Sequence, residues 1–280
     1  MSDLATLAVM RDVFAIAGLS LAIALTVYGV LRVTQDLHWN LEGNVLVRPY
    51  KTVDVCVALA LLSLMVWGGM QRGEEGTPKV EELSDAASAA GLFFSAVILI
   101  FLSLMLVGYL TIYRGLNPAE MFGLRQMSMA RAFGVSIGAV LLVVLSMGLI
   151  LYVATSLGLG WKDVDSSPQD TVKIFKNSGN VVSKVLLGVL AMVVAPLSEE
   201  IFFRGFLYGV VKRFTDRWFA AIFSALVFAA VHHHVGSLVP LFLLAIGFAL
   251  AYETTGCLLV PVFMHALFNA GNLAALSLQG

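Results

Sequence analysis

Charged residues are scarce in this sequence of 280 residues. Asp, Glu, Lys and Arg make up 12% of it, and the mean hydropathy is +0.91, whereas soluble domains are about 25% charged. This composition excludes a soluble globular enzyme and a disordered protein. The net charge of −1 excludes a nucleic-acid-binding protein, because there is no basic field to hold a phosphate backbone. In residues 218–280 Glu253 is the sole charged side chain, which predicts a polytopic membrane protein.

Cysteine is almost absent as well. Cys56 and Cys257 both lie in apolar runs, which predicts buried free thiols and no disulfide. The alternating pattern of a membrane β-barrel is also missing. The loops between apolar runs are too short to fold into a separate catalytic domain, so any chemistry must reside on the spans themselves.

Hydropathy predicts an all-α helical membrane bundle of about eight transmembrane helices. The predicted spans are 13–31, 53–70, 89–113, 132–158, 181–211, 218–235, 238–253 and 257–277. The run 181–211 is long and is interrupted by Pro196 and by Ser198-Glu199-Glu200. We divide the chain into an N-terminal four-span region, 1–180, of unknown role and a C-terminal membrane core, 181–280.

The basic residues predict an orientation. Loops 32–52, 114–131 and 212–217 hold nine Lys and Arg residues and the opposite side holds six, so the first side is predicted to be cytoplasmic. The loop near 253–257 should lie on that side too. A site reached from the basic side would then open to the cytoplasm.

Ionisable residues in the apolar C-terminal third form three groups. Because a charge at membrane depth costs several kcal/mol, these side chains should face a protein interior or a cavity. In the first group, Glu200 and Arg204 are spaced i, i+4 on a helix and can form an ion pair. Glu199 points about 100° away from Glu200 and stays free for acid–base chemistry. A simple polar break near the interface is the alternative for this group.

The second and third groups each place a histidine in an apolar run. Phe228 and His232 are four residues apart, and His233 and His234 follow directly. His265 and Asn269 lie on one helix face, where both can donate hydrogen bonds to the same small volume. Packing roles or interhelical hydrogen bonds are the alternatives for these residues.

The depths of the three groups agree. At 1.5 Å per residue, Glu199, His232 and His265 lie between about 12 and 22 Å from the basic loops. Independent packing residues have no reason to share a depth, so the sequence predicts one composite site. A carboxylate and a histidine near one water form a general-base pair. A His/Asn pair on the opposite side of the site forms a candidate oxyanion hole. Together the two pairs suit amide hydrolysis. Glu199, His232 and His265 could instead bind Zn²⁺; the sequence does not decide whether there is a cofactor.

The three groups resemble the motifs E-E-x-x-x-R, F-x-x-x-H and H-x-x-x-N of the CAAX-protease and bacteriocin-processing family of intramembrane proteases. The resemblance covers about residues 180–277 and keeps the order of the motifs. It implies that Glu199 and His232 activate water and that His265 and Asn269 stabilise the oxyanion. It also implies that Glu200 and Arg204, which belong to the first motif, hold that motif in shape. The implied substrates are membrane-associated proteins or peptides, some of them lipidated, cleaved near the C-terminus.

Two other functions stay open at the level of sequence. A non-catalytic membrane scaffold of the same family would bind partner proteins, and a transporter would use Glu and His as a proton relay. The absence of a sequence repeat argues against the transporter. The expected location is a bacterial inner membrane, and the sequence does not indicate an oligomeric state. His233 is a possible substitute for His232 if the helix is shifted.

Overall fold

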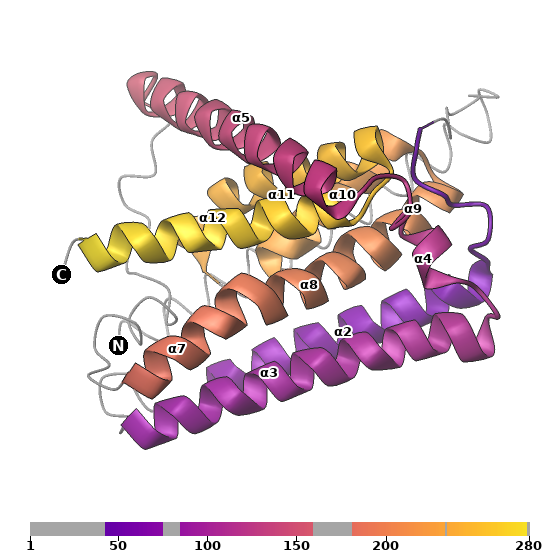
Figure 1. Cartoon of the computed structure of the whole chain (residues 1–280), viewed down its shortest axis with the longest axis horizontal. Helices are drawn as coiled ribbons and strands as arrows, with labels where there is room; N and C mark the ends of the chain where they lie inside the picture. The colour runs from indigo at the N-terminus through magenta and orange to yellow at the C-terminus, as the bar shows by residue number, and fades with distance from the viewer. Residues whose placement is uncertain (1–42, 75–84, 159–180, 233, 279–280) are drawn as a thin grey trace.

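The computed structural model describes residues 43–74, 85–158, 181–232 and 234–278, and every regular element within these ranges is a helix (Figure 1). The elements are α2 Thr52–Glu74, α3 Asp85–Gly108, η2 Tyr109–Tyr113, α4 Pro118–Met121, α5 Met129–Ser156, α7 Val181–Val189, η3 Leu190–Val194, α8 Ala195–Glu200, η4 Ile201–Tyr208, α9 Gly209–Phe214, α10 Arg217–Ala230, η5 Val235–Ser237, α11 Leu238–Thr255 and α12 Leu259–Leu278.

The predicted helical membrane bundle is confirmed. Within the described residues, five helical segments are long and apolar enough to cross a membrane: Ala90–Tyr113, Met129–Ser156, Val181–Phe214, Leu238–Thr255 and Leu259–Leu278. Two further predicted spans are shorter apolar helices, Thr52–Met65 and Arg217–Ala230. The first predicted span, 13–31, lies outside the described residues.

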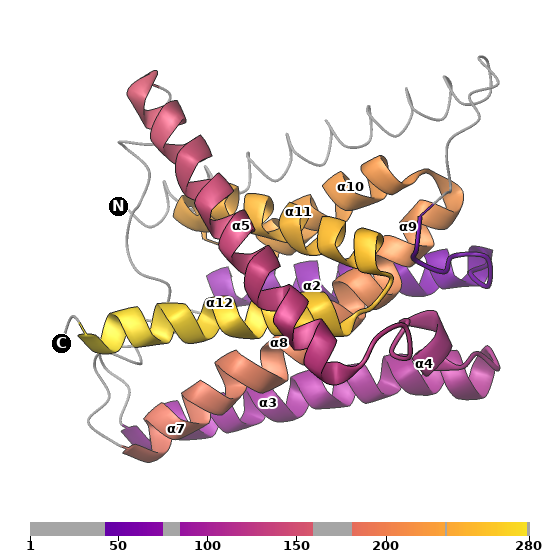
Figure 2. The same cartoon turned by 45° about the horizontal axis from the view of Figure 1, so that its top comes forward.

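Large apolar side chains cover the outer faces of α3 and α5, as expected where lipid replaces water. Leu104 and Leu145 are both well exposed. In Figure 2, α5 crosses α11 and α12 and its C-terminal half extends beyond them. Cys56 lies on the outside of α2, so the prediction that it is buried is wrong, whereas Cys257 is buried; both thiols are free.

One continuous helix from Val181 to Phe214 contains two π-helical segments, η3 and η4, on either side of α8. Proline has no backbone N–H, so Pro196 cannot continue the hydrogen-bond ladder of a helix. Ala195 donates to the carbonyl of Leu190, which is the i→i−5 pattern of a π-helix. The next acceptor in that pattern is Ala191, whose donor would be Pro196. A π segment ahead of Pro196 therefore leaves a carbonyl available for another partner.

The loops that were predicted to share one side meet at one end of the bundle, where α4 and the end of α9 lie (Figure 1). The backbone N–H of Asn44 donates to the carbonyl of Glu253 at 3.3 Å, and that of Leu258 donates to Phe122 at 2.9 Å. We call this the basic end, defined by residues 43–54, 114–128, 212–217 and 253–258. These contacts between loops support the prediction that the loops lie on one side of the bundle.

Buried ion pairs hold the basic end together. Lys212 is fully buried, and its Nζ lies 2.7 Å from Oε1 of Glu253. The other carboxylate oxygen of Glu253 accepts from the hydroxyl of Tyr208. Arg114 pairs with Asp54 at 2.5 Å. Removing one partner of such a pair costs about 3–5 kcal/mol, because a charge is left buried and uncompensated.

Tyr50 joins the segment before α2 to the helix that carries the first motif. Its hydroxyl donates to the carbonyl of Gly205 at 2.5 Å. Burial raises the pKa of Tyr50 well above its usual value, so the phenol stays protonated and able to donate. A Cβ at Gly209 would lie 2.5 Å from the Tyr50 ring, so glycine is needed there for close packing. One apolar core contains residues from both predicted regions of the chain, including Leu110 and Phe206.

Candidate active site

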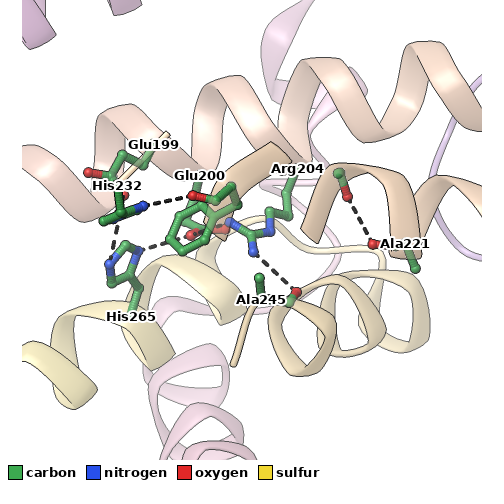
Figure 3. Close-up of polar contacts among 9 residues, drawn as sticks. Glu199, Glu200, Arg204, Ala221, His232, Ala245 and His265 are labelled. Atoms are coloured by element: carbon green, nitrogen blue, oxygen red, sulfur yellow. Dashed lines mark hydrogen bonds and ion pairs between the residues drawn. The ribbon is translucent and has the colours of Figure 1, made fainter. Parts of the chain in front are cut away.

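The two adjacent glutamates at the end of α8 have different surroundings. Glu200 is fully buried, and its Oε1 lies 2.8 Å from Nη1 of Arg204. The predicted i, i+4 ion pair is therefore present. Glu199 turns toward two histidines (Figure 3), and 22% of its side chain is exposed. One carboxylate is neutralised by an internal cation, whereas the other has no Lys or Arg partner among the described residues.

Arg204 is enclosed by polar and aromatic partners. Its Nη2 donates to the carbonyl of Ala245 in α11 at 3.1 Å. The guanidinium carbon lies 4.6 Å from the centre of the Phe228 ring and 5.3 Å from that of Phe248. Ring faces attract a desolvated guanidinium. These contacts stabilise the buried charge of Arg204. Arg204 in turn holds the carboxylate of Glu200 in place.

His265 on α12 contacts both glutamates. Its Nδ1 lies 3.0 Å from Oε1 of Glu200, and its Nε2 lies 4.0 Å from Oε2 of Glu199. A carboxylate accepts hydrogen bonds, so we assign the Nδ1 proton to the bond with Glu200. In the neutral imidazole the other nitrogen, Nε2, is then an acceptor directed toward Glu199.

His232 follows the end of α10, and its ring is oriented as that of His265 is, with Nδ1 as the donor and Nε2 facing Glu199. Its Nδ1 donates to the backbone carbonyl of Phe228 at 2.7 Å, because a carbonyl can only accept. Nε2 of His232 lies 4.0 Å from Oε2 of Glu199. The ring of Phe228 packs against both imidazoles, with centroid distances of 4.7 Å to His232 and 5.8 Å to His265. Phe228 therefore helps to orient both histidines.

These contacts converge on one oxygen atom. Oε2 of Glu199 is buried and has no hydrogen-bond partner among the described residues. It faces two imidazole nitrogens at 4.0 Å. A water about 2.8 Å from each of two such atoms joins them at an angle of about 90°. The arrangement thus fits a water bound between Glu199 and a histidine.

The zinc alternative requires a tighter arrangement. Two ligands of a tetrahedral Zn²⁺ at about 2.0–2.1 Å lie about 3.4 Å apart, which is less than the 4.0 Å between Glu199 and either histidine. In the part of the chain that the structure describes, no group of three or more His, Cys, Asp or Glu side chains could hold a metal ion. These side-chain positions fit water and do not fit zinc.

Asn269 lies one helical turn beyond His265 and contacts the π segment η3. Its Nδ2 donates to the carbonyl of Ala191 at 2.8 Å. Ala191 is the residue whose carbonyl loses its donor at Pro196, so Asn269 supplies the hydrogen bond that proline cannot. An amide group has two N–H donors, and the bond to Ala191 uses one of them. The second donor can serve a ligand.

The predicted residues meet as one cluster, with Asn269 beside it. Glu199, Glu200, His232 and His265 come together from three helices that are distant in sequence (Figure 3). Sequence reasoning missed three contributions: the carbonyls of Ala191 and Ala245, and the ring of Phe248. Pro196 was a usable signal for the first. His233, the proposed substitute for His232, lies outside the described residues.

Packing is uneven on the two sides of the cluster. His232 is 24% exposed at its side chain, whereas all residues from Phe203 to Val210, on the side of the basic end, are buried. Lys212 follows and is also buried. The water route from the basic side stays a prediction, and the buried residues from Phe203 to Val210 lie in that direction.

The C-terminal region that carries this cluster is similar to known proteins. Residues 181–271 match the Rce1-like family, described as type II CAAX prenyl endopeptidase Rce1-like. A Bacillus subtilis (strain 168) protein named "Putative membrane peptidase YdiL" is 31% identical over 84 residues, which cover 30% of this chain. The match spans about a third of that relative, 34% of its length. No solved structure matches the chain. The predicted resemblance to the CAAX-protease and bacteriocin-processing family is confirmed for this C-terminal region.

Proposed function

We propose that this protein is an intramembrane endopeptidase that cleaves membrane-associated proteins or peptides near the C-terminus. The family match and the membrane-peptidase relative support a membrane protease. One observation carries the finer proposal. A buried carboxylate oxygen of Glu199 faces Nε2 of both His232 and His265 and has no hydrogen-bond partner among the described side chains.

The first step of the proposed mechanism is water activation. A water held between Glu199 and His232 donates one hydrogen to each acceptor, so its lone pair is free to attack. Glu199 takes the proton as the water oxygen bonds to the carbonyl carbon of the scissile amide. General-base catalysis of this kind contributes about 10²–10⁴-fold to a rate. The same proton then moves to the leaving nitrogen, and the C–N bond breaks.

The second requirement is stabilisation of the oxyanion. We assign this role to His265 and Asn269. His265 can donate from Nε2 only when both of its ring nitrogens carry protons, and the carboxylate of Glu200 at Nδ1 stabilises that positive charge. Asn269 contributes its second N–H. Each such donor is worth about 10²–10³ in kcat. Glu200 and Arg204 act as supports that orient His265.

The substrate and location complete the proposal. The apolar surroundings of the site suit a membrane anchor or lipid chain on the substrate, and the bilayer is the surrounding phase. We place the protein in a bacterial cell membrane with its basic loops in the cytoplasm. The geometry supports a mechanism that uses the protein's own carboxylate and needs no metal.

Cleavage by purified protein tests the proposal. Wild type, Glu199→Gln and the control Glu120→Gln are incubated with membrane-anchored C-terminal peptides, prenylated and unprenylated. Glu120 lies in α4, away from the site. We expect cleavage by wild type and Glu120→Gln and a loss of at least about 100-fold in Glu199→Gln. Full activity in Glu199→Gln would refute the mechanism, and binding of peptides without cleavage by any variant would favour the scaffold.

A further inference from the structure

The long helix that carries the first motif offers a backbone carbonyl to a foreign side chain at each of its two π segments. At η3 the carbonyl of Ala191 accepts from Nδ2 of Asn269 at 2.8 Å. At η4 the carbonyl of Gly205 accepts from the hydroxyl of Tyr50 at 2.5 Å. Gly205 directly follows Arg204 in the chain. The two bonds therefore hold the helix before and after the stretch that contains the motif.

The carbonyl of Gly205 is available because η4 departs from the α-helical pattern. In a regular α-helix its donor would be the backbone N–H of Gly209, four residues on. That N–H donates to the carbonyl of Phe206 instead. A buried carbonyl left without a partner costs about 1–3 kcal/mol. The phenol of Tyr50 thus satisfies a carbonyl that has lost its usual helical donor.

Close packing restricts the same stretch of backbone. A Cβ at Gly205 would lie 2.9 Å from the ring of Phe122, and a Cβ at Gly209 would lie 2.5 Å from the ring of Tyr50. The ring of Tyr50 also meets that of Phe206 edge-on, with centroids 6.0 Å apart. The backbone that follows Arg204 therefore lies between two aromatic rings, one of which carries the hydrogen-bond donor.

Tyr50 itself is held in a fixed position. The carbonyl of the preceding residue, Pro49, accepts from Nη2 of Arg114 at 2.9 Å. The backbone N–H of the following residue, Lys51, donates to Asp54 at 2.6 Å. Arg114 and Asp54 are the two members of one buried ion pair. Both chain neighbours of Tyr50 are thus bound to the same pair, which presents the phenol in one place.

Contacts continue from Arg204 to the reacting groups (Figure 3). Arg204 pairs with Oε1 of Glu200, and the same oxygen lies 3.0 Å from Nδ1 of His265. A displacement of the backbone at Arg204 would pass along this series of contacts to the imidazole. Misplacement of a catalytic group by about 1 Å can lower a rate about 100-fold.

We infer that Tyr50 is a positioning residue for the proposed reaction. Its hydroxyl holds the carbonyl of Gly205 and so keeps Arg204 in place, and Arg204 acts on His265 through the contacts above. The inference rests on the proposed function and deepens it. Tyr50 lies outside residues 181–271, which match the family, so the segment before α2 gains a role in the reaction.

Two single-hydroxyl variants test this inference. Tyr50→Phe removes the hydroxyl and keeps the ring that packs beside Gly209. Tyr208→Phe is the matched control, because it removes a hydroxyl from a buried acceptor, Glu253, on the same helix and leaves the carbonyl of Gly205 untouched. Thermal unfolding in detergent gives the loss of stability in each variant, and steady-state kinetics gives kcat and KM per folded molecule.

We expect kcat to fall about 10- to 100-fold in Tyr50→Phe with KM nearly unchanged, and both constants to stay at the wild-type values in Tyr208→Phe. An unchanged kcat in Tyr50→Phe, or an equal loss in both variants, overturns the inference. Gly209→Ala is a second test should Tyr50→Phe fail to fold. Its Cβ displaces the Tyr50 ring without removing a polar group, and it should lower kcat in the same way; an unchanged kcat overturns the inference.

A readout without catalysis separates this inference from the proposed function. ¹⁵N NMR of histidine-labelled protein reports which ring nitrogen of His265 carries the proton, and His265→Gln identifies the signal. We expect the His265 signal to shift in Tyr50→Phe and to stay in place in Tyr208→Phe. A signal that does not shift in Tyr50→Phe overturns the inference. The expected shift in a protein that cleaves no peptide refutes the proposed function and keeps the positioning of His265 by Tyr50.

Discussion

His265 and Glu200 form a buried pair, with Nδ1 of the imidazole 3.0 Å from Oε1 of the carboxylate. The same oxygen lies 2.8 Å from Arg204, so one atom links a fixed cation to a histidine of the site. The pairing decides which nitrogen of His265 faces Glu199. The second glutamate of the motif therefore acts on the site through the histidine that it orients.

Replacing Glu200 by Gln should lower both activity and stability. The charge on Arg204 loses its compensation, and breaking a buried pair costs about 3–5 kcal/mol. Loss of a partner that orients a histidine typically lowers activity about 10- to 100-fold. Thermal unfolding in detergent and kcat measured well below the unfolding temperature separate the two effects. A variant with unchanged kcat would show that Glu200 does not orient His265.

Replacing Asn269 by Ala should lower kcat by about 10²–10³ and leave KM nearly unchanged, because an oxyanion donor acts mainly in the transition state. Asn272→Ala is the matched control, since this residue lies on the same helix and is exposed. Steady-state kinetics with one peptide compares the three proteins. An equal loss in both variants, or a rise in KM alone, would contradict the role of Asn269.

Chelators should not reduce activity. The 4.0 Å separations around Glu199 fit a bound water and exceed what a tetrahedral zinc requires. Purified protein is dialysed against a strong chelator, and cleavage is compared with an untreated sample while metal content is measured. Activity that disappears with the metal and returns on addition of Zn²⁺ would establish the metal-dependent alternative.

The ion pair at the basic end should affect stability without affecting catalysis. Lys212→Met leaves Glu253 buried and unpaired, which should cost about 3–5 kcal/mol. Adding Glu253→Gln removes the remaining charge and keeps an acceptor for Tyr208, so the double variant should recover part of the loss. Unfolding by denaturant measures both, and kcat per folded molecule should stay at the wild-type value. A fall in kcat of folded protein would show coupling to the site.

The residues of the site could be predicted from sequence because helices have a fixed period and rise. The pairing of Glu200 with Arg204 follows from i, i+4 spacing, and the shared depth of Glu199, His232 and His265 follows from counting residues to the loops. The helical bundle itself follows from hydropathy. These are local or one-dimensional properties of the chain.

Other features depend on tertiary packing and could not be predicted in this way. The burial of Phe203 to Val210 depends on which side chains fill the space between helices. The exposure of Cys56 depends on which face of α2 meets lipid. The contact of Arg204 with the carbonyl of Ala245 joins residues 41 apart in sequence, and no periodicity indicates it.

The π segment at Leu190–Val194 has a consequence for the insertion or deletion of residues in this helix. Each residue of an α-helix turns the chain by about 100°, and a π segment accommodates one extra residue within a turn. Removing a single residue there would close the π turn and would rotate Val181–Val189 relative to α8 by about 100°. The carbonyl of Ala191 would then leave Asn269, while Glu199 kept its place beside the histidines. The length of this segment therefore sets the rotational phase between the two halves of the helix, and with it the position of the Asn269 amide.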